Sequence, residues 1–184
     1  MDEGLNKFVD RVLFTKKEIA DRVAELGKQI TEYYEKDSAD LLLVCILKGG
    51  VMFMTELMKN VDLDVEIDFM SVASYGANTV SSGDVRIIKD IENPFMGKNL
   101  LIVEDIIDTG YTLDYLTKNL KDRGAKSVKI AALLNKEGRR VVDLHGDFVG
   151  FDIPDEYVIG YGMDFNQKLR NLPYVATLKA RYYK

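Results

Sequence analysis

The sequence predicts an α/β fold built on a mainly parallel, doubly wound sheet flanked by helices. The run at 41–47 is continuously apolar, as expected of a strand that is covered on both faces, and the mainly apolar runs at 99–103 and 128–134 are also predicted to be strands. Amphipathic helical patterns separate these runs, and strand, helix and strand in succession are typical of parallel sheets. A chain of 184 residues can bury one sizeable core, so we expect a single domain over 1–184.

The first element is a predicted helix over 15–35. Thr15 and Glu18 have the spacing of a capping box, in which each side chain bonds the other's backbone amide. Apolar residues then recur at helical spacing and predict the face that packs on the core. This face comprises Ile19, Val23, Leu26, Ile30 and Tyr33.

A short helix and a hairpin follow the first strand. Residues 51–59 have a helical pattern, and alternation over 65–70 predicts a half-buried strand. Small and polar residues at 74–84 predict a mobile loop, from which a strand returns at 85–89. The apolar side of the half-buried strand is predicted to be Val65, Ile67 and Phe69.

The second half contains one more helix, over 112–123, which Gly124 is placed to end. Short strands are predicted beyond it at 148–151, 157–161 and 175–178. We expect a core over about 38–140, and a small hood built from about 1–14 and 145–184.

Composition limits the possible partners and compartment. Lysine and arginine total 25 against 30 acids, giving a net charge of -5, which disfavours binding to nucleic acid or membrane through bulk charge. Cys45 is the only cysteine, so an intrachain disulfide is excluded and a reducing compartment is favoured. No apolar run has the length of a membrane span, and the N-terminus has no secretory pattern. We therefore expect a cytoplasmic protein.

The segment 103–112 carries most of the chemical information. Glu104 and Asp105 end an apolar run, and adjacent carboxylates suit a vicinal diol or a diol-bound Mg²⁺. The backbone amides and hydroxyls at 109–112, at a helix start, suit a phosphate monoester. Together they describe a site for a ribose 5-phosphate.

Three other interpretations of this segment are disfavoured. A capping loop, with Asp108 or Thr109 as the N-cap and the other acids solvated, would be the simplest interpretation of a lone Asp-Thr-Gly, but the full ten-residue arrangement argues against it. Asp-Thr-Gly also occurs in aspartic proteases, but the α/β alternation argues against their paired-aspartate site. The sequence contains no Walker A motif and no Gly-x-Gly-x-x-Gly after a strand.

Lys48, Gly49 and Gly50 follow the first apolar run and offer a second anion site. Glycines allow the backbone to approach a ligand closely, and Lys48 adds a cation at a strand end. In open α/β sheets ligands bind beyond the carboxyl ends of the strands, where both motifs are predicted to lie.

With these motifs in the same order, the sequence resembles the purine salvage phosphoribosyltransferases, in particular their bacterial hypoxanthine-guanine branch. The resemblance spans about 41–178 and implies the type I phosphoribosyltransferase fold, Mg²⁺ as cofactor and a homodimer or homotetramer. It implies transfer of a phosphoribosyl group from 5-phosphoribosyl 1-pyrophosphate (PRPP) to hypoxanthine or guanine. The segments that carry it are 47–50, 74–76, 103–110, 147–154 and 158–161.

The resemblance implies a role for each donor-site residue. Glu104 and Asp105 hold the ribose hydroxyls, directly and through Mg²⁺, and Asp108 accepts the proton from N7 of the purine. Lys48 and Gly49 bind pyrophosphate next to a non-proline cis peptide, and Arg170 meets the same group. The 5-phosphate is cradled by Thr109, Gly110, Tyr111 and Thr112.

The resemblance also implies the acceptor site. Lys136 donates to O6, which favours 6-oxopurines over adenine. Tyr157 and Ile106 sandwich the purine ring, the Val158 backbone reads its polar edge, and Asp164 supports a second Mg²⁺. We expect the loop at 74–84, which begins with Ser74 and Tyr75, to close as a lid.

Two other functions are alternatives. One is a regulatory module that binds phosphoribosyl ligands and RNA without turnover, and the other is a transferase for xanthine or adenine. For Arg139 and Arg140 a solvated face is favoured, and His145 is interpreted as structural or exposed.

Overall fold

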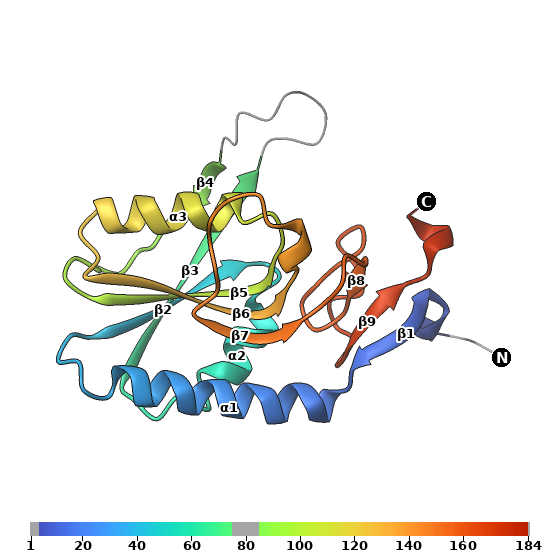
Figure 1. Ribbon diagram of the computed structural model, residues 1–184, viewed down its shortest axis with the longest axis horizontal. Coiled ribbons are helices and arrows are strands. Elements are labelled where there is room, and N and C mark those ends of the chain that lie inside the picture. Colours follow the sequence, from blue (N-terminus) through green and yellow to red (C-terminus); the bar gives the residue numbers. More distant parts are fainter. Residues whose placement is uncertain (1–3, 75–84, 184) are drawn as a thin grey trace.

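The computed structural model, which describes residues 4–74 and 85–183, confirms the predicted α/β fold (Figure 1). Six strands form the large sheet in the order β4-β3-β2-β5-β6-β7, and every neighbouring pair except β3 and β4 is parallel. The strands are β2 (Leu41–Leu47), β3 (Val65–Ser74), β4 (Val85–Lys89), β5 (Asn99–Ile107), β6 (Ser127–Asn135) and β7 (Phe148–Asp152).

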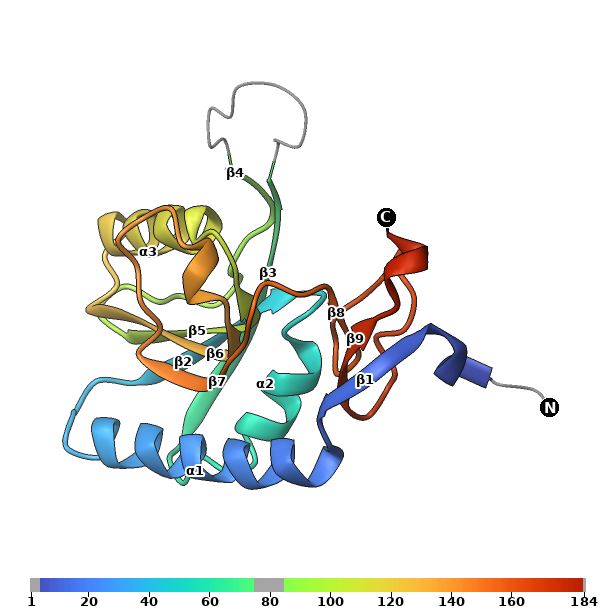
Figure 2. The ribbon, with the colours of Figure 1, turned by 45° about the vertical axis from the view of Figure 1, so that its right-hand side comes forward.

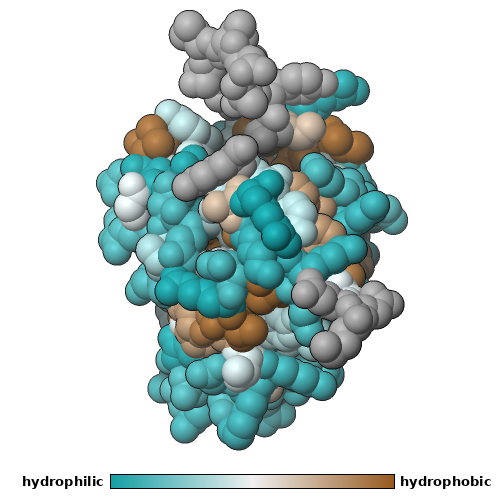
Figure 3. All heavy atoms as spheres, turned by 90° about the vertical axis from the view of Figure 1, so that its right-hand side faces the viewer, coloured by the Kyte–Doolittle hydropathy of each residue, from teal (hydrophilic) through white to brown (hydrophobic). Residues whose placement is uncertain are grey.

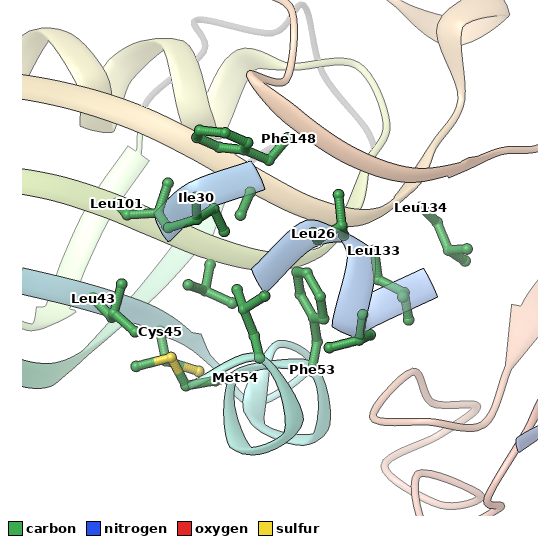
Figure 4. Close-up of a cluster of buried hydrophobic side chains, with 14 of the residues drawn as sticks. Leu26, Ile30, Leu43, Cys45, Phe53, Met54, Leu101, Leu133, Leu134 and Phe148 are labelled. Atoms are coloured by element: carbon green, nitrogen blue, oxygen red, sulfur yellow. The ribbon is translucent and has the colours of Figure 1, made fainter. Parts of the chain in front are cut away.

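Helices cover both faces of this sheet. In Figures 1 and 2, α1 (Lys16–Tyr34) and α2 (Val51–Leu57) lie on one face, and α3 (Tyr111–Asp122) lies on the other. The two faces bury separate apolar clusters, and Figure 4 shows Phe53 and Met54 of α2 packed with strand residues in the first of them. This two-sided burial explains why β2 is apolar at every position.

The first helix begins as predicted. The Thr15 side chain accepts the Glu18 amide N–H at 3.3 Å, and the Thr15 amide donates to Glu18 Oε2 at 2.8 Å, which completes the capping box. The end of the buried face was predicted one residue too early, because Tyr33 is 55% exposed and Tyr34 is buried. Tyr34 has the helical spacing from Ile30 that places it toward the sheet.

A small antiparallel sheet forms the hood, in the order β1 (Val9–Phe14), β9 (Val175–Leu178) and β8 (Val158–Ile159). It lies at one end of the large sheet, close to both chain termini, and its outer side is mainly hydrophilic (Figures 2 and 3). The predicted start of the C-terminal hood segment at 145 was too early, because β7 completes the edge of the large sheet. Short 3₁₀ helices lie at Gly4–Phe8, Glu137–Arg139 and Ala180–Tyr182.

The buried side of β3 differs from the prediction. Ile67 is 40% exposed, whereas Asp68 and Met70 are buried. Met70 packs into the cluster on the α3 face, while the opposite face of β3 is only partly covered. The Asp68 carboxylate is accommodated because it accepts the backbone N–H groups of Glu92 and Asn93, both at 2.8 Å.

Replacing Asp68 with leucine is expected to lower the free energy of unfolding by about 2–4 kcal/mol, because it leaves these amides unpaired. Burial raises the pKa of Asp68, but the amide donors and Lys89 outweigh burial and hold it below its usual value. The charged form therefore stabilises the fold above the unfolded pKa of about 4, and this contribution is lost as the pH falls through the lower folded value. Urea unfolding at pH 7 and pH 3 measures the difference in free energy of unfolding between the unaltered protein and Asp68→Leu, and this difference should be smaller at pH 3. Asp90→Leu, at an exposed position, serves as control. An equal difference at both pH values would contradict this account.

The chain reverses its direction of travel across the sheet between β2 and β5. From β2 it passes through α2 to β3 on one side, and from β5 it passes through α3 to β6 on the other. Ligands of open α/β sheets bind at such a switch point, beyond the carboxyl ends of the strands. Within 4–74 and 85–183, no helix combines the length and apolarity needed to cross a membrane.

Candidate active site

The acidic pair lies where two neighbouring strands part. β5 continues to Ile107, beyond the predicted end at Val103, so Glu104 and Asp105 belong to the strand itself. The β2–β5 ladder has its last pair at Cys45 and Val103, whereas β5 stays paired with β6 to the end. Both carboxylates therefore lie beside the opening that β2 leaves.

The loop after β5 leads directly into α3, which begins at Tyr111. Its N-cap is Gly110, with φ of 89° and no side-chain capping bond. The capping-loop interpretation is therefore wrong, since neither Asp108 nor Thr109 caps the helix. The first amides of α3 have no partner inside the helix, and they lie at the edge of the site together with the hydroxyl of Thr112.

Two adjacent cavities open on this sheet edge and share a wall formed by Asp105, Ile106 and Asp108. The first, of about 240 Å³, is also lined by Ile46, Val72, Glu104, Thr109, Gly110, Thr112 and Leu113. The second, of about 210 Å³, is also lined by Lys136, Tyr157, Val158, Met163 and Asp164. The residues predicted for the ribose phosphate and those predicted for the purine thus separate into neighbouring cavities with a common wall.

The turn after β2 touches both the acidic pair and the hood. The peptide bond between Leu47 and Lys48 is cis, as the resemblance implies. A Cβ on Gly49 would lie 1.8 Å from Asp105 Oδ2, and a Cβ on Gly162 would lie 2.0 Å from the Gly49 carbonyl oxygen. Only glycines allow these three segments to approach so closely.

Arg170 and Asp164 form an ion pair on the hood side of the second cavity, with Arg170 Nη2 at 2.6 Å from Asp164 Oδ1. Gln167, which sequence reasoning missed, joins this pair to the β2 turn. Its Oε1 accepts from Lys48 Nζ at 3.2 Å and from Arg170 Nη2 at 3.3 Å. Its backbone N–H donates to Asp164 Oδ2 at 2.8 Å. A single glutamine in an irregular segment gives no sequence signal for such a position.

The second cavity has an aromatic wall. Tyr157 is supported by Tyr183, stacked at 5.2 Å between ring centroids, and by Phe165, edge-on at 5.9 Å. Neither supporting ring lines the cavity, and neither was identified from the sequence. Burial raises the pKa of the Tyr157 hydroxyl, and Asp164 adds to this shift. The ring therefore presents a neutral face to the cavity.

Comparison with known proteins decides the family. A model of the phosphoribosyl transferase domain matches residues 12–166. The chain belongs to the phosphoribosyltransferase family. A protein of Streptococcus thermophilus named hypoxanthine-guanine phosphoribosyltransferase is 48% identical over 97% of this chain and 98% of its own. One of Bacillus subtilis with the same name is 46% identical over 96% and 97%. A solved hypoxanthine phosphoribosyltransferase of Staphylococcus aureus superposes with a TM-score of 0.93 at 43% identity, over 98% of this chain and 97% of its own.

The first cavity of this phosphoribosyltransferase is lined by two adjacent carboxylates, which are the ligands that Mg²⁺ uses when a substrate supplies further oxygens. Partial burial and the neighbouring Asp105 carboxylate raise the pKa of Glu104 well above its usual value. No group of three metal-ligating side chains comes together in the described part of the chain. Mg²⁺ commonly binds one or two carboxylates and takes its other ligands from substrate oxygens and water, so Glu104 and Asp105 fit it.

The Arg139–Arg140 segment contacts the loop after β5. Arg139 is exposed, in agreement with the predicted solvated face, whereas for Arg140 that prediction was wrong. Arg140 is half-buried and donates from Nη1 to the Asp108 carbonyl at 2.7 Å. Arg139 donates from Nε to Asp108 Oδ1 at 2.9 Å. The Val141 amide donates to the Thr109 carbonyl at 3.0 Å. Sequence reasoning missed these contacts because an adjacent basic pair is common on protein surfaces.

A few predicted residues lie away from the two cavities. Tyr111 is 41% exposed and lines neither of them. His145 is exposed, in agreement with the prediction. Ser74 ends β3, while Tyr75 and the rest of the predicted lid, 75–84, lie outside the described residues.

Proposed function

We propose that this phosphoribosyltransferase transfers the phosphoribosyl group of PRPP to hypoxanthine or guanine, giving IMP or GMP and pyrophosphate. The observation that carries the proposal is the pair of cavities with a common wall of Asp105, Ile106 and Asp108. A donor sugar in one cavity and an acceptor base in the other would meet at that wall. The relatives named hypoxanthine-guanine phosphoribosyltransferase support this choice of substrates.

The donor binds in the first cavity. The 5-phosphate lies against the backbone of the loop and the first turn of α3, with Thr109 and Thr112 adding hydroxyls. Glu104 and Asp105 accept from the ribose hydroxyls. Lys48, Gly49 and Arg170 hold the pyrophosphate; the two cations already share Gln167 as a partner.

Glu104 and Asp105 would hold Mg²⁺ together with PRPP, and Asp164 would support a second Mg²⁺ from the hood. Mg²⁺ bound there would supply positive charge against the negative charge that develops on the departing pyrophosphate. The chain contributes Lys48 and Arg170 to the same task, and their charge is fixed in place before the reaction begins.

The acceptor purine binds in the second cavity between Tyr157 and Ile106. Lys136 donates to O6, and the backbone of Val158, in β8, reads the polar edge of the ring. Asp108 accepts the N7 proton as N9 attacks the anomeric carbon and the bond to pyrophosphate breaks. General-base catalysis of this kind contributes about 100- to 10,000-fold. Closure of 74–84 over the site, which would exclude water, stays a prediction.

An activity panel tests the function directly. The enzyme is incubated with PRPP, Mg²⁺ and one of hypoxanthine, guanine, xanthine or adenine, and pyrophosphate release is followed. We expect turnover with hypoxanthine and guanine. Turnover with adenine alone would contradict the role of Lys136, and no release with any base would overturn the enzymatic function. The RNA-binding alternative is disfavoured by the net charge of -5.

The remaining proposals concern assembly and compartment. We propose a homodimer or homotetramer in the cytoplasm that binds neither nucleic acid nor membrane. Light scattering after size-exclusion chromatography measures the mass directly. A value of 20.9 kDa at micromolar concentration would mean a monomer and would contradict the assembly proposal.

Shortening Gln167 tests the pyrophosphate subsite. Gln167 has φ of 64°, a conformation that asparagine tolerates, so Gln167→Asn removes the reach of the side chain without straining the backbone. The loss of its two hydrogen bonds is expected to raise KM for PRPP about 3- to 10-fold and to leave KM for hypoxanthine unchanged. Steady-state kinetics with each substrate varied in turn measures both constants. The neighbouring, exposed Lys168→Ala serves as control, and an equal rise in both KM values would refute the assignment.

A further inference from the structure

A chain of four alternating charges joins the two groups that are predicted to read one edge of the purine. Lys136 Nζ lies 3.5 Å from Asp155 Oδ1, and Arg139 Nη1 lies 3.3 Å from Asp155 Oδ2. Arg139 Nε then donates to Asp108 Oδ1 at 2.9 Å. O6 and N7 lie on the same edge of a 6-oxopurine, so in the proposed function the ends of the chain, Lys136 and Asp108, face two groups on one edge of the base.

We propose that Arg139 is a positioning residue for Asp108 and that Asp155 anchors Arg139. This inference rests on the proposed function. Lys136 and Asp108 line the purine cavity, whereas Arg139 and Asp155 do not, so the latter two act through the former. Because Arg139 occupies Oδ1 of Asp108, the carboxylate rotation is fixed and Oδ2 is left to accept the N7 proton.

Arginine suits this position for a geometric reason. Nε and Nη1 of the planar guanidinium point in different directions, so one side chain bridges two separate carboxylates and holds their relative orientation. The backbone fixes where the bridge starts, because the Arg139 amide donates to the Lys136 carbonyl at 3.1 Å within a 3₁₀ turn. Lysine would place a single charge there without a fixed plane.

These ion pairs add little to folding. The side chains of Arg139, Asp155 and Asp108 are 44%, 57% and 43% exposed, and ion pairs at such exposure are largely screened by solvent. Variants with substitutions at Arg139 or Asp155 are therefore expected to fold normally. A change in their kinetic constants then reports on the active site and not on folding.

The test compares Arg139→Gln, Arg139→Lys and Asp155→Asn in the full-length enzyme. The matched control is Arg123→Gln, which breaks a similarly exposed pair with Asp90, at 3.0 Å, on the far end of α3. For each variant, kcat and both KM values are measured, and thermal melting confirms folding.

We expect Arg139→Gln to lower kcat about tenfold and to leave KM for PRPP unchanged, because the substitution removes only the fixed orientation of the Asp108 carboxylate. Arg139→Lys should lower kcat nearly as much, because a lysine cannot bridge the carboxylates of Asp108 and Asp155 in a fixed plane. Asp155→Asn should lower kcat less than Arg139→Gln does. It should raise KM for hypoxanthine, because Lys136, which is proposed to donate to O6, loses its ion pair with Asp155. The double variant Arg139→Gln/Asp155→Asn should have the kcat of Arg139→Gln alone, because Asp155 acts on Asp108 only through Arg139.

Three results would overturn the inference: a kcat of Arg139→Gln no lower than that of Arg123→Gln, full kcat in Arg139→Lys, or a rise in KM for PRPP that matches the loss in kcat. Absence of turnover in the unaltered enzyme is a different result. It overturns the proposed function itself, and it is seen before any variant is compared.

Discussion

Replacing Asp108 with asparagine is expected to lower kcat by about 100- to 10,000-fold, the range that a general base contributes. Asparagine keeps the shape of aspartate, and its amide oxygen can still accept from Arg139 Nε, so the loop geometry is preserved. It cannot take up the N7 proton. The initial rate of IMP formation at saturating PRPP and hypoxanthine measures the effect.

The control for this variant is Asp143→Asn, which neutralises a fully exposed carboxylate on the connection after β6. It should keep the kcat of the unaltered enzyme. Calorimetric Kd values for PRPP should change by less than about threefold in Asp108→Asn, because the Asp108 side chain is assigned to the purine and the phosphates are held by other groups. Unchanged turnover in Asp108→Asn would show that another group accepts the proton.

Replacing Gly162 with alanine is expected to lower the free energy of unfolding by about 2–5 kcal/mol, the sum of backbone strain and overpacking. Gly162 has φ of 100°, and its added Cβ would lie 2.0 Å from the Gly49 carbonyl oxygen. Neither backbone can yield without moving its segment. The variant is also expected to lose activity, since the Gly162 carbonyl accepts from Arg170 Nη1 at 2.7 Å. Urea denaturation followed by circular dichroism gives the stability, and PRPP kinetics gives the activity.

Gly97→Ala separates the two contributions. Gly97 also has a positive φ, of 78°, but a Cβ there would meet nothing within 4 Å. It should cost only the backbone strain, about 1 kcal/mol, and leave activity intact. If both variants were equally stable, the Cβ added at position 162 would not clash with the Gly49 carbonyl oxygen, and the prediction would be refuted.

The parts of the fold that local rules determine were predictable. The capping box at Thr15 and Glu18, the apolar run of β2 and the stop at Gly124 each depend on near neighbours in the sequence, and the structure confirms all three. The loop after Val103 was recognised as a site because several weak signals coincide within ten residues. Except for Val103, Ile107 and Tyr111, those residues line two adjoining cavities together with Lys136 and Tyr157.

What could not be predicted depends on contacts between distant segments. Asp68 looked solvent-facing because the amides of Glu92 and Asn93 that satisfy it lie more than 20 residues away. Arg139 looked like an ordinary surface charge because its partners, Asp108 and Asp155, meet it only in the folded chain. The predicted end of β5 at Val103 was too early, because an acidic pair after an apolar run is typical of a loop. Only the pairing with β6 shows that the strand continues to Ile107.

The carboxyl end of β5 lies between the two cavities. In the proposed function, residues of β5 and the start of α3 bind the sugar phosphate, whereas Lys136, Tyr157 and Val158 bind the base. Substitutions at Lys136, Tyr157 or Val158 are therefore expected to change the base preference with little effect on the donor. Arg140, Gly162 and Asp164 lie in the same part of the chain but contact donor-site residues, so changes there are expected to affect both substrates. The same holds for the shared wall of Asp105, Ile106 and Asp108, which borders both cavities.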